Sequence, residues 1–433
     1  MNSRDTLLVK NSDLIISGVK ANDIVKNYGS PVYVMDQNHI ENVIDSFFSA
    51  LKENYDYSNI SYASKAFCCK EIYRVISDKN IMTDVVSEGE LYTALSANFN
   101  PKNIIFHGNN KTYSELEFAI SNGVGLIVVD SYSEVEDISK ISIANGVITD
   151  VLIRVNPGIE AHTHHYIQTA RPDSKFGFSI QTGDADKIIK KVKSQKNVNL
   201  RGLHCHIGSQ IFDNKSFVLA VDKMTNYYKY LFDNFGYELD ILNLGGGFGI
   251  YYSEDDKKIT LSDYKDAVKL ITNELKSQIT KLNIKKPFLI LEPGRAIVGE
   301  AGVTLYTIGR IKEIENLKNY ISIDGGMFDN PRYALYQAKY SAILANRANE
   351  IPTTKYTVAG KCCESGDLII EEVMLPKANE GDILAVFSTG AYNYSMSSNY
   401  NRNLIPSVVM IKDGKCRLAV KKQTLQDLIR NDI

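Results

Sequence analysis

The sequence predicts an α/β protein in which a (β/α)8 barrel of the TIM type is combined with an all-β domain. The chain has 433 residues, which is more than one ordinary domain uses. Short β-branched segments alternate with amphipathic segments from residue 30 to about residue 300, and short strands with turn residues dominate beyond it. We therefore expect a barrel domain over residues 30–299 and a β-domain formed by residues 1–29 and 300–433.

The barrel strands are predicted from segments that are mostly continuous apolar runs ending in polar or glycine residues. These segments are ISYASK (60–65), IMTDVVS (81–87), NIIFHG (103–108), GLIVVD (125–130), VLIRVNP (151–157), LRGLHCHIG (200–208), ILNLGGGFG (241–249) and PFLILEPGR (287–295). Such runs are typical of parallel strands buried on both faces. About eight strand–helix units over roughly 250 residues favour a closed barrel over an open doubly wound sheet, which remains the alternative. Segments such as KEIYRVISDKN and LSDYKDAVKLITNELKSQITKL have helical spacing.

The second domain is predicted from short strands and scarce helices, and is expected to be a β-sandwich or a small barrel. Its strand candidates include GVTLYTIGRIKEI, YISIDGG, YTVAGK, DLIIEEVML, DILAVFS and SVVMIKDGKCRLAVKK. The N-terminal LLVKNSDLIISGV is β-like, so we expect it to pair with this domain, and QTLQDLIRND near the C-terminus is expected to form a short helix.

Composition excludes several functional classes. Lys and Arg number 49 against 51 Asp and Glu, so bulk charge favours neither nucleic acid nor an anionic membrane. The six cysteines lack the CxxC spacing of a zinc site. The polar N-terminal residues do not resemble a signal peptide, and no apolar run is long enough to span a bilayer. A reduced, cytoplasmic protein is expected, without a nucleic-acid or membrane partner.

In a barrel, chemistry is expected where strands end at their carboxyl side. Lys65 ends the first strand in SYASKAF, where desolvation would make its amine a nucleophile able to form a Schiff base; a surface lysine is the plain alternative. After the seventh strand, Gly245, Gly246 and Gly247 could bring backbone N–H groups to a phosphate, although a tight turn would look the same. Asp84, His107 and Arg154 are further strand-end candidates.

Two more strand ends carry polar clusters. In LEPGR, Glu292 could hydrogen-bond a protonated pyridine nitrogen and Arg295 could clamp an anion; an ordinary buried Glu–Arg pair is the alternative. In HCHIGSQ, a histidine could stack on a planar ring and Ser209 could bind phosphate. A zinc site built from His204, His206 and the cluster His162, His164 and His165 is the rival interpretation.

The second half of the chain adds DNPRYALYQ (329–337), KCCESGD (361–367) and STGAYNYSMSSNYN (388–401). A cysteine beside a carboxylate and followed by glycine suits a proton donor placed on a loop, so Cys363 is a candidate; an inert structural cysteine is the alternative.

Together these motifs resemble the fold-type III pyridoxal-phosphate enzymes with an alanine-racemase-like barrel and, within them, the diaminopimelate decarboxylase family. The resemblance covers essentially the whole chain in family order, through ASKA, HCHIGSQ, GGGFG, EPGR, NPRYALY, CESGD and GAYNYSMSSNYN. It departs from the family pattern at three places. Lys361 and Cys362 replace the usual residues before CESGD, so that Cys362 puts a second thiol beside Cys363. Asn393 stands where glycine is common, and residues 331–333 are one of several variants.

The resemblance implies decarboxylation of meso-2,6-diaminopimelate to L-lysine and CO2 with pyridoxal 5′-phosphate, in a homodimer with shared active sites. It implies three catalytic residues, namely Lys65, His206 and Cys363, with Cys363 supplied by the other subunit. The implied cofactor-binding residues are Lys65, Asp84, Arg154, His206, Ser209, Gly245, Gly246, Gly247, Glu292, Pro293, Gly294, Arg295 and Tyr392. The implied substrate-binding residues are Arg295, Arg332, Tyr336, Glu364 and Tyr392, and no metal is expected.

Three alternatives remain at this point. One is a related decarboxylase acting on ornithine, arginine or a carboxylated polyamine. Another is a homologue that binds the cofactor without turnover, and the third is a metal-dependent barrel hydrolase. The pairing of Arg295 and Arg332 with Glu364 favours a substrate whose far end carries both a carboxylate and an ammonium group.

Overall fold

The computed structural model describes residues 4–159 and 174–433, which form two compact units. The barrel unit comprises Val43–Gly249 and Ile259–Gly294. The β unit comprises Met1–Asn42, Ile250–Lys258 and Arg295–Ile433. No helix among the described residues is long and apolar enough to cross a membrane.

Eight parallel strands of the barrel unit close into a barrel, because β9 pairs with β8 on one side and with β11 on the other. The strands are β5 (Ser58–Ala63), β6 (Met82–Val85), β7 (Ile104–Phe106), β8 (Leu126–Val129), β9 (Thr149–Asn156), β11 (Val198–His204), β12 (Ile241–Asn243) and β13 (Phe288–Leu291). A short strand, β10 (Phe178–Ser179), adds to β9. The predicted (β/α)8 fold and each of its eight strand segments are confirmed.

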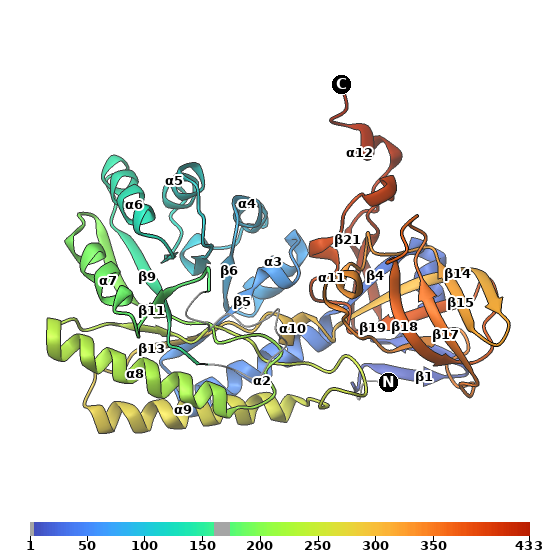
Figure 1. Cartoon of the computed structure of the whole chain (residues 1–433), viewed down its shortest axis with the longest axis horizontal. Helices are drawn as coiled ribbons and strands as arrows, with labels where there is room; N and C mark the ends of the chain where they lie inside the picture. Colours follow the sequence, from blue (N-terminus) through green and yellow to red (C-terminus); the bar gives the residue numbers. More distant parts are fainter. Residues whose placement is uncertain (1–3, 160–173) are drawn as a thin grey trace. The chain divides into compact units, whose positions relative to one another are not determined.

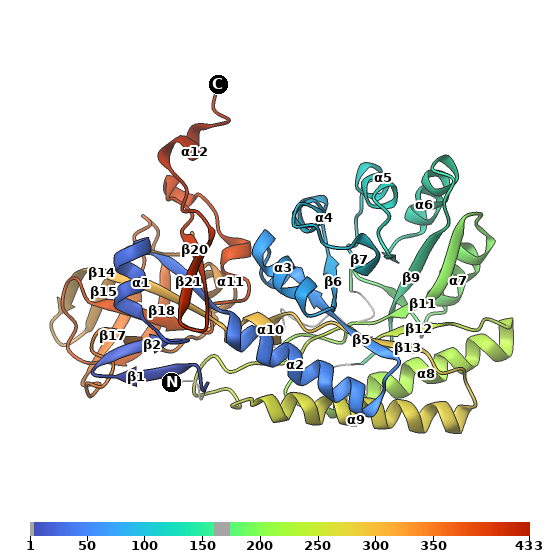
Figure 2. The same ribbon diagram turned by 180° about the vertical axis from the view of Figure 1, so that it is seen from behind.

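Helices alternate with the strands, the first of them before β5 and each of the others after a strand, and they surround the barrel (Figure 1). They are α2 (Gln37–Asn54), α3 (Lys70–Asp78), α4 (Glu88–Leu95), α5 (Tyr113–Ser121), α6 (Tyr132–Ala144), α7 (Asp184–Ser194), α8 (Lys215–Phe235) and α9 (Leu261–Leu282). Several begin where a hydroxyl caps the first turn, as Ser87, Thr112, Ser131 and Thr260 do. Helices α8 and α9 lie side by side in both Figure 1 and Figure 2.

The barrel is filled by alternate residues of its strands, as the two-residue period of a strand requires. Leu126 and Val128 of β8 pack in one cluster with residues from five other strands. The remaining members are Met82, Ile105, Leu152, Ile241 and Ile290. With the interior closed by apolar side chains, polar side chains at the strand ends are left to form the functional face.

The β unit is built around a nine-stranded sheet among its described residues. Its strands are β4 (Val32–Asp36), β14 (Gly302–Ile314), β15 (Lys318–Ile323), β16 (Ala342–Leu344), β17 (Thr354–Ala359), β18 (Leu368–Leu375), β19 (Ile383–Phe387), β20 (Ser407–Lys412) and β21 (Lys415–Val420). The long β14 joins two parts of the sheet, because its first half pairs with β4 and β19 and its second half pairs with β15. Short helices are α1 (Ala21–Tyr28), α10 (Arg295–Val298), α11 (Arg332–Tyr336) and α12 (Leu425–Ile429).

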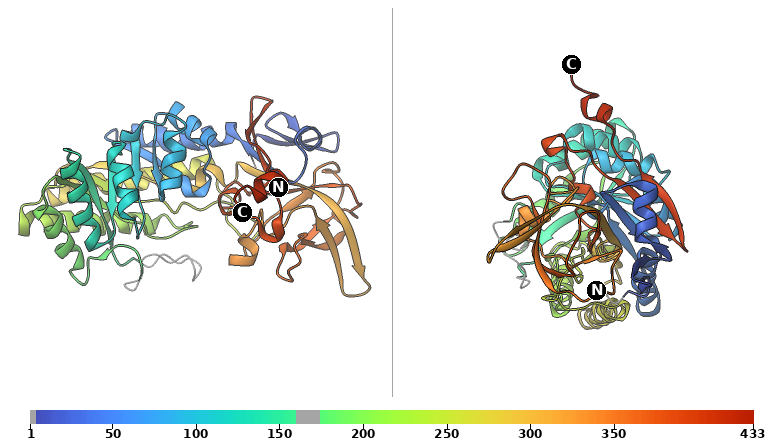
Figure 3. Two further views of the ribbon diagram at one scale, coloured as in Figure 1. Left: turned by 90° about the horizontal axis from the view of Figure 1, so that it is seen from above. Right: turned by 90° about the vertical axis from the view of Figure 1, so that its right-hand side faces the viewer.

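The N-terminal β-like segment forms β1 (Leu7–Lys10), β2 (Asp13–Ile16) and β3 (Val19–Lys20), which pair with one another in a separate sheet. Leu7, Leu14 and Ile16 nevertheless share one core with β4, β14, β19 and β20, and the segment lies beside the orange and red strands in Figure 3. Residues 30–42, 250–258 and 295–299, which the sequence-based ranges assign to the barrel domain, lie in the β unit. For residues 32–36 the reason is that β4 pairs with β14 and β20.

Candidate functional site

The carboxyl ends of the barrel strands carry the predicted polar residues. Lys65 lies in a single 3-10 turn directly after β5 and is exposed. Asp84 lies near the end of β6, Arg154 near the end of β9, and Glu292 directly after β13. Because all eight strands are parallel in a closed barrel, these side chains belong to one face.

Glu292 is the centre of a buried hydrogen-bond network. Its Oε1 lies 2.9 Å from His107 Nε2 and accepts from Asn243 Nδ2 at 2.6 Å, while its Oε2 lies 3.2 Å from His204 Nε2. The rings of His107 and His204 meet edge to face, with centroids 4.8 Å apart. All four residues are at most 7% exposed, so the network is shielded from water.

The electrostatics of this network keep Glu292 ionised. Burial alone would raise the pKa of Glu292, but the neighbouring His107 and His204 outweigh burial and hold this pKa well below its ordinary value. Burial lowers the pKa of His204 to about 4, so His204 is neutral at physiological pH. Burial, followed by the charges of Lys65 and Arg154, lowers the pKa of His206 well below its usual value.

The glycine turn after β12 is too crowded for side chains. A Cβ on Gly246 would lie 2.1 Å from the carbonyl oxygen of Glu292, and one on Gly247 would lie 2.4 Å from the carbonyl oxygen of Gly208. The backbone N–H of Gly245 donates to Asn243 Oδ1 at 2.9 Å. The turn is therefore a backbone surface pressed against the ends of neighbouring strands.

His206 and Ser209 lie in the loop after β11. The imidazole Nδ1 of His206 accepts the backbone N–H of Gly246 at 3.3 Å, which ties this side chain to the glycine turn. The structure thus brings His206 together with Gly246, whereas His204, two residues earlier, faces Glu292.

The charge of Lys65 acts on two carboxyl groups, the buried Asp84 and the half-buried Glu90. Burial raises the pKa of Asp84, Glu292 raises it further and the charge of Lys65 lowers it. The Oδ1 atom of Asp84 is buried without a hydrogen-bond partner among the described residues. Glu90, at the start of α4, accepts from the Ser64 hydroxyl at 2.8 Å and from the Val86 backbone at 2.8 Å. Arg154 stacks on Phe176 at 4.3 Å.

These observations fit pyridoxal 5′-phosphate. An exposed lysine amine beside a buried carboxylate suits an aldehyde, and an ionised, shielded glutamate suits a protonated ring nitrogen. A backbone turn that only glycine can form suits a phosphate. The unpartnered Asp84 Oδ1 marks a polar position that protein groups leave open.

Within the β unit, two predicted arginines and a predicted tyrosine lie in one cluster. Arg295 Nη1 donates to the Tyr252 hydroxyl at 2.5 Å, and its guanidinium lies 4.8 Å from the centre of the Tyr392 ring. Arg332 lies 4.6 Å from the centre of the Tyr252 ring and donates to the Tyr340 hydroxyl at 2.9 Å. Tyr252 and Tyr340 therefore join Arg295, Arg332 and Tyr392, although no motif pointed to either tyrosine.

Asn393 supports the arginine–tyrosine cluster through its side-chain amide. Its side chain is fully buried, lies 3.3 Å from the Tyr340 hydroxyl and donates to the Thr389 carbonyl at 3.0 Å. Its amide therefore supports the tyrosine that binds Arg332.

The two adjacent thiols differ in access. Cys363 is exposed, whereas Cys362 is buried, and burial raises the pKa of Cys362 to about 12. Asp367 holds this loop, accepting from the backbone N–H groups of Cys362 at 2.7 Å and Met327 at 2.6 Å. Cys363 is thus the thiol of the pair that can meet another molecule.

The remaining predicted substrate-binding residues of the β unit are also exposed. Tyr336, at the end of α11, is 48% exposed, and the Glu364 side chain is open to solvent. These two residues are available at the surface but do not belong to the buried arginine–tyrosine cluster.

The rival zinc interpretation is not favoured by its described members. His204 and His206 face different partners, namely Glu292 and Gly246. His162, His164 and His165 lie outside the described residues. His107, His204 and Glu292 do bring potential ligand atoms within 4.8 Å of one another, but their separations of 2.9 and 3.2 Å are those of hydrogen bonds.

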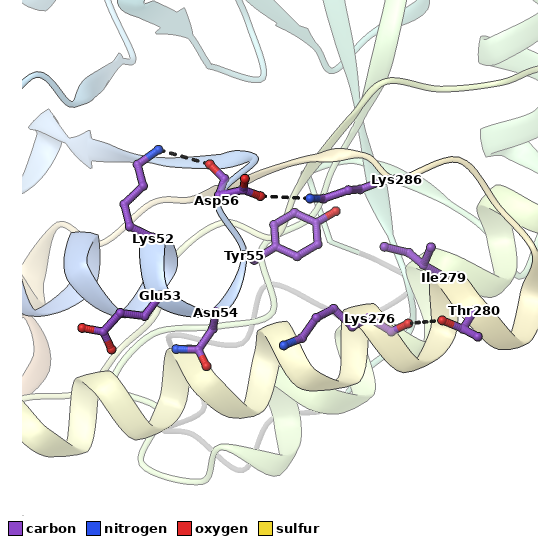
Figure 4. Close-up of a pocket in the computed structure, with 9 residues that line it drawn as sticks. All are labelled: Lys52, Glu53, Asn54, Tyr55, Asp56, Lys276, Ile279, Thr280 and Lys286. Atoms are coloured by element: carbon purple, nitrogen blue, oxygen red, sulfur yellow. Dashed lines mark hydrogen bonds and ion pairs between the residues drawn. The ribbon is translucent and has the colours of Figure 1, made fainter.

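A surface hollow of about 570 Å³ lies at the other end of the strands (Figure 4). It is lined by the end of α2, by α9 and by Lys286, just before β13. Lys286 Nζ pairs with Asp56 Oδ1 at 3.0 Å, and Lys52 Nζ donates to the Asp56 carbonyl at 3.1 Å. Its polar groups therefore largely bind one another, as expected for the face of a barrel that serves stability.

Comparison with known proteins agrees with this geometry. The family model for the pyridoxal-binding domain of pyridoxal-dependent decarboxylases matches residues 41–299. The diaminopimelate decarboxylase of Staphylococcus aureus is 48% identical over 424 residues, which cover 98% of each chain. That of Bacillus subtilis is 44% identical, over 97% of this chain and 95% of its own.

A solved structure supports the same relationship. The crystal structure of diaminopimelate decarboxylase from M. jannaschii with L-lysine superimposes with a TM-score of 0.91 at 33% identity, covering 100% of this chain and 99% of the other. The family and cofactor predicted from the motifs are confirmed. The chain belongs to the diaminopimelate decarboxylase family of pyridoxal-dependent decarboxylases.

Proposed function

We propose that this protein is a lyase that removes CO2 from meso-2,6-diaminopimelate to form L-lysine, using pyridoxal 5′-phosphate held in the barrel unit. The supporting observation is that the chain is 44 to 48% identical, over nearly its full length, to proteins named diaminopimelate decarboxylase. The L-lysine in the related M. jannaschii crystal structure supports the product.

When bound, pyridoxal phosphate supplies an electron sink for the electron pair that departing CO2 leaves at Cα. Lys65 would hold the aldehyde through its amine and would assist release of the product. Glu292 would accept a hydrogen bond from the ring nitrogen, and the low pKa of Glu292 keeps its carboxylate ionised for that contact. His206 would pack against the ring.

The other barrel residues bind and orient. Backbone N–H groups of the glycine turn and the Ser209 hydroxyl bind phosphate. The proposed cofactor-binding set is completed by four more barrel residues, Asp84, Arg154, Pro293 and Gly294, and by two residues of the β unit, Arg295 and Tyr392.

Substrate choice is assigned to the β unit. Arg295 and Arg332 bind the distal carboxylate, and Glu364 binds the distal ammonium group. Tyr336 and Tyr392 complete the proposed substrate-binding set. Arg332 is 7% exposed, and losing a buried charged contact of this kind costs about 2–5 kcal/mol. Substrates without the distal carboxylate should therefore react far more slowly.

The protonation step requires a donor at Cα, and we assign it to Cys363 of the partner subunit in a homodimer. The exposure of Cys363 supports this assignment, because a buried thiol could not serve another copy of the chain. The dimer itself and a cytoplasmic location are also proposals, which ultracentrifugation and cell fractionation test.

The experiment is CO2 release by the holoenzyme supplied with meso-diaminopimelate, L-ornithine or L-lysine in parallel. We expect release from meso-diaminopimelate alone, with L-lysine as the product. Arg332→Leu should lower kcat/KM for meso-diaminopimelate by about 30-fold or more, the lower end of the free-energy cost above. Equal release from ornithine would overturn the substrate assignment, and no release from any of the three would overturn the function.

A further inference from the structure

Glu292 has few acceptor positions left for a cofactor. An ionised carboxylate offers about four lone-pair positions. His107 and Asn243 occupy both positions of Oε1, and His204 occupies one of Oε2. One position, on Oε2, is left.

The histidine protons follow from this arrangement. An ionised carboxylate can only accept hydrogen bonds, so both histidines must donate from Nε2. The neutral state of His204 agrees with that tautomer, as does its buried Nδ1, which has no partner among the described residues. Both rings are therefore fixed as Nε2–H donors facing Glu292.

The anionic state of Glu292 depends on these donors. The titratable and charged groups that interact with Glu292 are His107, His204, His206, Asp84, Arg154 and Cys205. Burial opposes the anion, and the nearby Asp84 carboxyl would oppose it when charged. The contacts from the two histidines outweigh both effects.

Asn243 connects Glu292 to the glycine turn through two hydrogen bonds. Its Nδ2 donates to Glu292 at 2.6 Å, and its Oδ1 accepts the backbone N–H of Gly245 at 2.9 Å. One buried amide thus fixes the carboxylate and the first glycine of the turn at the same time. The proposed ring-nitrogen and phosphate contacts are held in register by a single side chain.

We propose that His107, His204 and Asn243 are positioning residues that keep Glu292 anionic and leave its fourth acceptor position for the ring nitrogen of pyridoxal phosphate. This inference rests on the proposed function only in taking the ring nitrogen as the occupant of that position. The three residues act through Glu292 and are not assigned to the reacting atoms.

The test compares His204→Leu, which removes the donor, with His204→Gln, whose amide can replace Nε2–H. His39→Leu is the matched control, because His39 is another largely buried histidine, and it belongs to the β unit. Pyridoxal phosphate is titrated into the cofactor-free full chain from pH 5.5 to pH 8, and each dissociation constant is divided by the wild-type value at the same pH. Infrared difference spectra of the cofactor-free chain report protonated carboxyl groups, with Glu292→Gln in the same background to assign the band.

For His204→Leu we expect the ratio to rise at least about tenfold between pH 8 and pH 5.5, since each unit of increase in the pKa of Glu292 is worth a factor of ten. A Glu292 carboxyl band should appear at the acid end in the Leu variant. His204→Gln and His39→Leu should keep a constant ratio and show no such band.

A constant ratio without a new band in His204→Leu would overturn the proposal, and so would His204→Gln behaving like His204→Leu. If His204→Leu does not fold, His107→Leu and His107→Gln give the same comparison. Wild-type protein that binds no pyridoxal phosphate at any pH would instead refute the proposed function. The infrared measurement would still decide whether the donors hold Glu292 ionised.

Discussion

Gly246→Ala is the substitution whose effect follows most directly from the geometry of the proposed cofactor site. Gly246 does not have a positive φ, so space alone decides the outcome. The new Cβ would lie 2.1 Å from the carbonyl oxygen and 2.9 Å from the carbonyl carbon of Glu292. Both are backbone atoms directly after β13, so neither can turn aside as a flexible side chain could.

The turn and the β13 end must therefore separate by on the order of 1 Å, a displacement that can cost about 100-fold at a site of chemistry. It would disturb the contact from Gly246 to His206 Nδ1 at 3.3 Å and the backbone that carries Glu292. We expect decarboxylation by the holoenzyme to slow by about 100-fold, pyridoxal phosphate to bind more weakly, and the folded state to lose about 1–3 kcal/mol.

Affinity is measured by titrating pyridoxal phosphate into the cofactor-free chain and monitoring absorbance, and the rate is measured as CO2 release by the holoenzyme. Stability is measured by urea unfolding of the cofactor-free chain. Gly89→Ala is the control, because its Cβ would meet only Ser87 Oγ at 3.8 Å and Gly89 lies in helix α4. That variant should bind normally and gain about 0.5–1 kcal/mol. Wild-type affinity in Gly246→Ala would refute the claim that a crowded turn after β12 shapes the cofactor site.

Three further predictions concern the supporting structure. Lys111→Met should cost about 3–5 kcal/mol in urea unfolding, because it strands Glu134, whose buried carboxylate lies 2.7 Å from Lys111 Nζ; a cost below about 1 kcal/mol would contradict this. Burial raises the pKa of Asp329 to about 8, so the folded protein holds a proton that the unfolded chain loses. Stability from this group should fall as pH rises from about 4 to about 8, by up to about 1.4 kcal/mol per unit, and Asp329→Asn should remove that slope from urea-unfolding measurements. Asp367→Asn should lower kcat by about tenfold or more with pyridoxal phosphate affinity unchanged, and should change the alkylation rate of Cys363, because the NH2 group of asparagine would face one of the two backbone N–H groups that now donate to Asp367; an unchanged alkylation rate would oppose this role.

The barrel could be predicted because each of its strands and helices is marked by a pattern within its own segment of the sequence. Each strand is a continuous apolar run that ends in polar or glycine residues, and the 261–282 helix repeats apolar residues at helical spacing after a capping threonine. Such patterns do not show which unit a strand joins. The run VYVMD of β4 looks like any buried strand, and only its pairing with β14 and β20 places it in the β unit.

The sequence predicts where part of the candidate site lies, but it does not predict the contacts between the residues of the site. Lys65, Glu292 and the glycine turn stand at strand ends, and barrel topology collects strand ends on one face. The pairing of Glu292 with His107, His204 and Asn243 depends on barrel closure and register, which no single segment encodes. His107 is among the strand-end residues that the sequence analysis names, whereas Asn243 is not; Asn243 also stands at a strand end, and that signal could have marked it.

No sequence pattern predicts that Tyr252 and Tyr340 lie around the two arginines. Tyr252 lies in an irregular segment of the β unit and Tyr340 follows α11 without a motif of its own. They meet Arg295 and Arg332 only because segments far apart in sequence pack together in that unit. Contacts of this kind come from tertiary packing and cannot be found from periodicity.

The central claim is that the barrel unit binds pyridoxal phosphate through Lys65, and borohydride reduction of the holoenzyme followed by peptide mapping tests it most directly. Reduction converts the link between aldehyde and amine into a stable bond and so marks the lysine that carries the cofactor. We predict a pyridoxyl group on the peptide that contains Lys65, and none on this peptide in Lys65→Ala. A label on a different lysine, or no label in protein that binds the cofactor, would contradict the account.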